Sequence, residues 1–258
     1  MRYVYVIGLL LSAGLMARAQ AWTDFDNPGK LKPFHGMRYM VETQGSFSNN
    51  KTPLWLNANK YGLSSLESNN GYMRGMVARD LAQDSIRRWG IGYGVDVAVP
   101  VNYTSSVVVQ QAYAELRWLY GVLTVGSKQQ PMELKNNALS SGSQTLGINA
   151  RPVPQVRLAL PDYWVLPFSH GWLRVKGHIA YGKMTDDNWQ HEVTDCKSKY
   201  ADDVLYHSKA GYIKIGNEDR FMPWSLELGL EMAATFGGTA YRPQSDGTML
   251  ALKGEGGL

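Results

Sequence analysis

Residues 225–236 read Ser225-Leu226-Glu227-Leu228-Gly229-Leu230-Glu231-Met232-Ala233-Ala234-Thr235-Phe236. The large apolar side chains share the even positions, and both glutamates share the odd ones. Because the side chains of a strand point alternately to opposite faces, the stretch predicts a strand with one apolar and one acidic face. Glutamates are costly in a protein core but not beside water. The pattern therefore favours lipid on one side of the strand and water on the other, as in a transmembrane β-barrel.

The same two-residue period recurs along most of the chain. We expect strands at 37–48, 72–81, 92–99, 107–118, 122–127, 156–160, 173–181, 210–216 and 225–236, with a weaker candidate at 54–60. No helical period of useful length appears. The sequence therefore predicts an all-β fold, an antiparallel transmembrane β-barrel of which about ten strands are visible.

The connections between the expected strands alternate between short and long. The turn at 119–121 and the segments 161–171 and 217–223 are short, whereas 128–155 and 182–208 are long. Outer-membrane barrels have short periplasmic turns and long extracellular loops, so both long segments are expected outside the cell. A secreted β-sandwich would also alternate its connections. It would not carry lumen-type charges on so many strands, nor Tyr and Trp near so many strand ends.

The N-terminus has the pattern of an export signal. Arg2 precedes an apolar run at 4–16, and Ala17-Arg18-Ala19 matches a cleavage site. A membrane anchor helix is the alternative, but the run is shorter than the ~20 apolar residues that span a bilayer. We assign 1–19 to a cleavable signal peptide, 20–37 to a short periplasmic segment and 38–258 to the barrel. The expected location is the outer membrane.

Composition narrows the functional classes. Without Arg2 and Arg18, the mature chain would carry 24 basic against 22 acidic residues. No basic patch with interleaved aromatic residues appears, so nucleic acid is not expected as a partner. Cys196 is the only cysteine, which leaves no disulfide framework and no cysteine metal cluster.

Catalytic motifs are sparse. The residues Asp186, Asp187, His191 and Asp195 could be taken as a metal or acid–base cluster, but such spacing in a polar loop is usual for solvated charge. No serine lies in a Gly-x-Ser-x-Gly elbow. We therefore expect a protein that is not an enzyme and that carries no cofactor and no metal.

Five stretches in the middle of the chain carry a family resemblance. They are 126–134 (Gly-Ser-Lys-Gln-Gln-Pro-Met-Glu-Leu), 139–143 (Leu-Ser-Ser-Gly-Ser), 146–154 (Leu-Gly-Ile-Asn-Ala-Arg-Pro-Val-Pro), 160–164 (Leu-Pro-Asp-Tyr-Trp) and 171–178 (Gly-Trp-Leu-Arg-Val-Lys-Gly-His). Together they resemble the capsule assembly protein Wzi family, in the form carried by Bacteroides-like bacteria. The resemblance runs from about 39 to 241, and its Asn-Ala-Arg-Pro-x-Pro core is specific.

The resemblance implies an occluded outer-membrane barrel of about eighteen strands. The ten strands visible here would be its first half, and the glycine-rich end at 252–258 leads us to expect a truncated member. The segment 20–37 is too short for the N-terminal helical plug of the enterobacterial members. The implied role is a surface lectin that binds capsular polysaccharide and helps to assemble or anchor the capsule.

Sugar binding needs aromatic rings and planar hydrogen-bonding groups. Our candidate polysaccharide contacts lie in the two long loops and are Gln129, Asn136, Asn137, Asn149, Arg151 and Trp189. Asn149 and Arg151 could instead pin their loop into the barrel mouth, which is an equally good reading. Tyr163 and Trp164 are better explained as part of an interfacial girdle.

Three functional classes remain open on these grounds. A polysaccharide-binding surface protein is the first, and a porin or transporter with a charged lumen is the second. An outer-membrane hydrolase is the third, and it lacks an identifiable nucleophile and base. The expected partners are capsular polysaccharide and outer-membrane lipid, and the expected state is a monomer.

Overall fold

The computed structural model describes residues 13–18, 33–140, 142–143, 145–195, 197–216 and 224–257, with the backbone alone at 13–18 and at Leu54. Most of the predicted signal peptide, most of the 20–37 segment, Cys196 and the predicted turn at 217–223 lie outside these residues. Within the predicted signal peptide, Ala13–Arg18 forms strand β1 and pairs with the next strand. The pairing is seen in a chain that retains residues 1–19, and cleavage after Ala19 stays a prediction.

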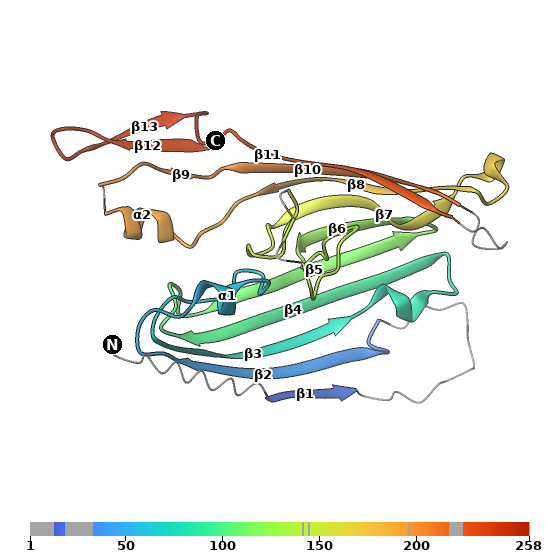
Figure 1. Ribbon diagram of the computed structural model, residues 1–258, viewed down its shortest axis with the longest axis horizontal. Coiled ribbons are helices and arrows are strands. Elements are labelled where there is room, and N and C mark those ends of the chain that lie inside the picture. The colour runs from blue at the N-terminus through green and yellow to red at the C-terminus, as the bar shows by residue number, and fades with distance from the viewer. Residues whose placement is uncertain are drawn as a thin grey trace. The chain divides into compact units, whose positions relative to one another are not determined.

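The described chain consists mainly of strands, as Figure 1 shows. The long strands after β1 are β2 (Met37–Phe47), β3 (Asn69–Arg79), β4 (Trp89–Val101), β5 (Val108–Trp118), β6 (Gly121–Ser127), β7 (Gln155–Val165), β8 (Leu173–Lys183), β10 (Leu205–Ile215) and β11 (Leu226–Phe236). A smaller sheet contains β9 (Tyr200–Asp202), β12 (Thr239–Pro243) and β13 (Met249–Lys253). Helical turns are short: α1 (Leu54–Asn57), η1 (Leu81–Asp84), η2 (Pro167–Ser169) and α2 (Trp189–Thr194).

The strands of the large sheet are ordered β1-β2-β3-β4-β5-β6-β7-β8-β10-β11. Neighbours in the sheet therefore follow one another along the chain, apart from β9, and their pairings are antiparallel. The predicted all-β antiparallel fold is confirmed. Among the described residues no pairing joins β1 to β11, so this sheet is open rather than closed into a barrel.

Two compact units divide the chain. The first contains residues 1–85, 91–114 and 127–152, and the second contains 86–90, 115–126 and 153–258. Strand β5 contributes its first seven residues to the first unit and its last four to the second.

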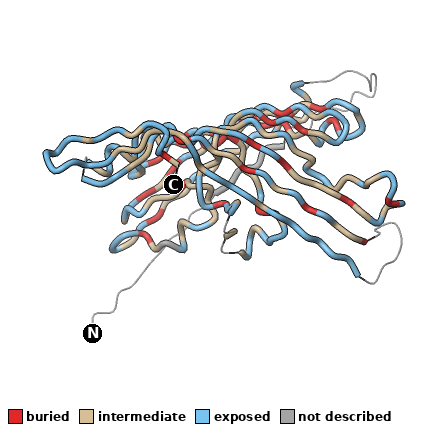
Figure 2. Tube along the Cα trace, turned by 90° about the horizontal axis from the view of Figure 1, so that it is seen from above, coloured by how far each residue is buried: buried red, intermediate tan, exposed pale blue. Residues whose placement is uncertain are grey.

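Buried and exposed residues alternate along β4 and along part of β8, whereas β11, the last strand of the sheet, is exposed along most of its length (Figure 2). On β4 of the first unit, Asp96 and Ala98 are fully buried, whereas Val95 and Val99 are more than half exposed. On β11 of the second unit, Leu230 is 69% exposed. Each sheet segment thus carries an exposed apolar face and an opposite face where polar groups gather. The two-faced strand predicted at 225–236 is confirmed.

Several local expectations were wrong. Residues 54–57 form α1 rather than a strand, within a connection that folds back over the polar face. Strand β7 continues to Val165, because a bulge between Leu160 and Trp164 keeps it paired with β8. Part of the glycine-rich tail pairs with β12 as β13.

The alternation on β5 changes phase near its start. Val108, Gln110 and Gln111 are all buried, so two consecutive side chains leave the exposed face at this point. An unbroken alternation over the expected strand 107–118 would place Val108 on the same face as Ala112. Instead it joins a small core with Leu63, Tyr72 and Ala98.

Candidate functional site

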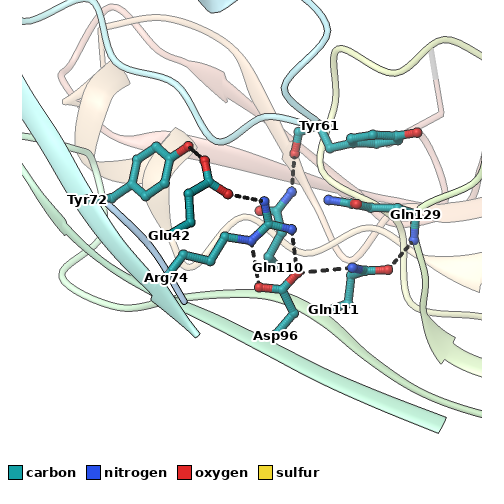
Figure 3. Close-up of polar contacts among 8 residues, drawn as sticks. All are labelled: Glu42, Tyr61, Tyr72, Arg74, Asp96, Gln110, Gln111 and Gln129. Atoms are coloured by element: carbon teal, nitrogen blue, oxygen red, sulfur yellow. Dashed lines mark hydrogen bonds and ion pairs between the residues drawn. The ribbon is translucent and has the colours of Figure 1, made fainter. Parts of the chain in front are cut away.

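A connected set of polar side chains covers the polar face of the first unit. It contains Glu42 on β2, Tyr72 and Arg74 on β3, Asp96 on β4 and Gln111 on β5, which together we call the polar network (Figure 3). Cross-strand register places them side by side. Glu42 pairs directly with Arg74, and Asp96 pairs with Met76, which lies two residues after Arg74 on the same face of β3. The members come from four successive strands and converge on one patch of the sheet.

Arg74 is the centre of the polar network. Its Nε and Nη2 atoms donate to the two carboxylate oxygens of Asp96 at 2.8 and 2.5 Å, and Nη1 lies 3.4 Å from Glu42. Asp96 has no exposed side-chain surface, and that of Arg74 is 15% exposed. The Tyr72 hydroxyl donates to Glu42 at 2.7 Å, and the Gln111 amide donates to Asp96 at 3.0 Å. Buried charges of this kind persist because each is paired and hydrogen-bonded.

Two long connections fold back onto this face. The backbone N–H of Gln129 donates to the Gln111 side chain at 2.9 Å, and the Gln110 amide donates to the carbonyl of Tyr61 at 2.7 Å. Lys128 lies 5.0 Å from the ring centre of Tyr113, also on the polar face. Segments 48–68 and 128–152 are therefore anchored through the two glutamines of the β5 phase change.

The two connections also bind each other. The Asn149 side chain accepts the backbone N–H of Asn59 at 2.7 Å, and the backbone N–H of Tyr61 donates to the carbonyl of Ile148 at 2.8 Å. Gly62 adopts a φ of +73°, and a Cβ there would lie 2.7 Å from the backbone nitrogen of Arg151. The close approach of the two segments therefore requires glycine at position 62.

Burial shifts the pKa values of two titratable side chains of segment 48–68. It lowers the pKa of Lys60, an effect that the nearby Glu42 carboxylate opposes. It also raises the pKa of the Tyr61 phenol. Both directions follow from desolvation, which disfavours the charged form of each group. The segment therefore sits close enough to the polar network to share its electrostatic field.

The structure brings together five of the six candidate sugar contacts in the first unit, mostly in structural roles. Asn137 bonds the backbone of Met132 in both directions, and Asn136 caps the N–H groups of Ala138 and Leu139. Asn149 and Gln129 hold their loop as described above. Arg151 lies two residues after Asn149, and its backbone packs beside Gly62. These contacts fix the conformation of loop 128–152. That these residues contact polysaccharide stays a prediction.

Asn149→Ala should release segment 53–63 from loop 128–152. The change removes the acceptor of the Asn59 N–H, which typically costs about 1 kcal/mol. Trypsin should then cleave faster at both Lys60 and Lys135 in the folded chain. Asn136→Ala is the matched control, since its bonds stay within loop 128–152, and it should accelerate cleavage at Lys135 alone. Equal cleavage at Lys60 in both variants would contradict this pinning role.

The polar face of the second unit carries its own series of contacts. The Thr124 hydroxyl donates to Glu115 at 2.9 Å, and Ser208 lies 3.3 Å from the His178 ring. Lys214 pairs with Glu227 at 2.9 Å, and the Tyr212 hydroxyl donates to Glu231 at 2.6 Å. Glu227 and Glu231 of β11 therefore both contact side chains of β10, on the face opposite the leucines of β11.

Tyr163 lies on this polar face rather than in an interfacial girdle. The Lys176 ammonium group lies 4.7 Å from its ring centre, and Lys214 lies 5.5 Å from it. The continuation of β7 past Leu160 explains the difference, because Trp164 pairs with outward-facing Val175 and the adjacent Tyr163 therefore points to the polar face.

Exposed aromatic residues gather at the short-turn end of the second unit. Trp89 stacks on Trp118 with ring centres 5.9 Å apart, and Tyr120 lies 5.9 Å from Trp164. Three further exposed aromatic residues occur beside the neighbouring short connections, namely Phe168, Trp172 and Trp224. Bands of aromatic residues at strand ends are typical of the membrane interface.

The opposite end of the second unit contains Trp189. This residue begins α2 and is 41% exposed, and it belongs to the second unit, whereas the other candidates belong to the first. Beside α2, a cavity of about 200 Å³ is lined by residues of 184–186 and 201–204 together with Gln190, Thr235 and Gly256. Tyr200 and Tyr241 stack nearby with ring centres 4.7 Å apart.

The sequence pattern missed most of the polar network. The alternation placed Asp96 and Gln111 on faces opposite apolar residues, which is a usable signal. Nothing in one strand shows that Glu42, Arg74 and Asp96 become neighbours. Across the described ranges, no group of three His, Cys, Asp or Glu side chains is placed to hold a metal ion.

Comparisons with known proteins returned nothing similar. No protein family, no curated protein and no solved structure matches this chain. In the part of the chain that the structure describes, no helix has both the length and the apolar character to cross a membrane. The fold and its contacts define an all-β protein with a two-faced antiparallel sheet and loops pinned on its polar face.

Proposed function

We propose that this chain is an outer-membrane β-barrel protein that binds capsular polysaccharide at the cell surface and helps to assemble or anchor the capsule. One observation carries the membrane location. Each unit exposes an apolar sheet face and gathers its charged side chains, paired and hydrogen-bonded, on the opposite face. A water-soluble sheet would bury the apolar face instead.

Two further features support the membrane location. Exposed aromatic residues mark the short-turn end of the second unit, where an interfacial girdle is expected. Long connections follow β2, β6 and β8 and short ones follow β5 and β7, while the connection after β4, at 102–107, departs from this alternation because it is short. The long connections are therefore proposed to be extracellular.

The binding role rests on the family resemblance and on the chemistry of the long loops. Loop 128–152 is held in a fixed conformation by the Asn137 and Asn149 side chains, and it carries Arg151, whose guanidinium group is of a kind that suits sugar hydroxyls and acidic sugar carboxylates. The cavity lined by Gln190 of α2 offers a second place of about 200 Å³ for a sugar residue. Surface binding needs such prearranged polar groups and does not need a nucleophile.

Capsule retention tests this proposal directly. A strain that lacks the gene should still make capsular polysaccharide but release it into the medium, and the wild-type gene should restore retention. Polysaccharide in the cell-bound and medium fractions would be measured by an immunoassay. Full retention in the deletion strain would refute the binding role.

Arg151→Ala separates ligand contact from loop structure. Losing one charged hydrogen bond typically costs about 1.5–3 kcal/mol, so affinity for the polysaccharide should fall roughly ten- to a hundredfold. The variant should still reach the outer membrane in normal amounts. If it fails to assemble there, Arg151 serves the barrel rather than the ligand.

A porin or transporter is the second candidate, favoured by the charged polar faces of both units. Against it, two loops are anchored over the polar face of the first unit. Conductance of the full-length protein in planar bilayers distinguishes the two functions. Steady open channels would favour the porin, and their absence together with polysaccharide binding would favour the lectin.

A further inference from the structure

The apolar face of the second unit has one conspicuous interruption on β10. Lys209 lies on this face, in register with Ile179 of β8 and Met232 of β11, which are 44% and 47% exposed. Lys209 is itself exposed. Among the residues that the structure describes, none forms an ion pair with it.

The neighbouring outward position on β10 is also basic. His207 lies two residues before Lys209 and is in register with Tyr181, whose ring centre lies 4.4 Å from its own. Tyr181 is 56% exposed. An imidazole, a phenol and an ammonium group thus lie close together on a face that otherwise presents mainly apolar side chains.

The reach of the side chain explains why a lysine is tolerated here. Lys209 lies four residues from the start of β10 and one residue from the middle of the strand. Four residues correspond to about 14 Å along the strand and roughly 10 Å along the normal of a bilayer if the strand tilts by about 40°. The lysine stem can extend its ammonium group toward the headgroups, and Tyr181, paired two positions nearer the strand end, marks an interfacial depth.

We propose that Lys209 and His207 bind the phosphate group of a lipid in the leaflet next to the long loops, with its acyl chains lying against Ile179, Ile213 and Met232. The inference rests on the proposed membrane location. Charge complementarity selects this partner, because an unpaired cation beside hydrocarbon needs an anion that is itself attached to hydrocarbon. A phosphorylated lipid meets both conditions.

Lipid titration of the full chain tests the inference. The protein is refolded into phosphatidylcholine vesicles, extracted into detergent and titrated with phosphatidic acid or phosphatidylcholine, and bound lipid is counted by native mass spectrometry. Wild type should prefer phosphatidic acid. Lys209→Gln should bind it about fivefold more weakly, as expected for one surface charge, and Lys209→Arg should retain the preference.

Lys253→Gln is the matched control, since Lys253 is an exposed lysine on β13 of the small sheet. It should leave lipid binding unchanged. Wild type without a preference, or Lys209→Gln with unchanged affinity, would overturn the lipid site while leaving the membrane location intact. A chain that enters no vesicle would overturn both.

Discussion

Replacing Asp96 with alanine should destabilise the folded chain by about 3–5 kcal/mol, the usual cost of removing one partner of a buried ion pair. Arg74 would lose both of its short bonds to Asp96 and keep only the 3.4 Å contact with Glu42. The Gln111 amide would also lose its acceptor. Urea unfolding of the full chain in detergent micelles or vesicles measures the change.

Asp80→Ala is the matched control for this experiment. Asp80 pairs with Arg38 at 2.7 Å in the same unit, but the two side chains are 41% and 44% exposed. Exposed pairs contribute only about 0–1 kcal/mol, so this variant should unfold almost like the wild type. Equal losses in the two variants would show that the polar network is not buried as described.

Leu230→Lys should reduce insertion into lipid vesicles severely. Leu230 lies near the middle of β11, is 69% exposed and belongs to the apolar face. A lysine at the midplane of a bilayer costs about 2–4 kcal/mol. In water the same exposed substitution would change stability by only about 0.5 kcal/mol either way. The folded, vesicle-bound fraction measured after refolding therefore distinguishes lipid from water at this face.

Leu250→Lys provides the comparison. Leu250 is 46% exposed on β13, in the small sheet rather than on the apolar face. This substitution should leave vesicle insertion unchanged. If Leu230→Lys inserted as well as Leu250→Lys, the apolar face would not contact hydrocarbon and the outer-membrane proposal would fail.

The sequence by itself determined the strand content and the two faces of many strands. The alternation at 225–236 is a local property, because each side chain's face depends only on its position along one strand. The structure confirms it through the Lys214 and Tyr212 contacts of Glu227 and Glu231. The turn at 119–121 was equally local, since Leu119 adopts a positive φ between two strands.

Only the tertiary structure decided which polar residues meet. Glu42, Arg74, Asp96 and Gln111 become neighbours through the register of four strands, and pairing energies between distant segments set that register. The phase change at Gln110 and Gln111 and the helical turn at 54–57 likewise depend on loops that fold back over the sheet. Periodicity within a strand records which face a residue occupies, but it carries no information about what lies across from it.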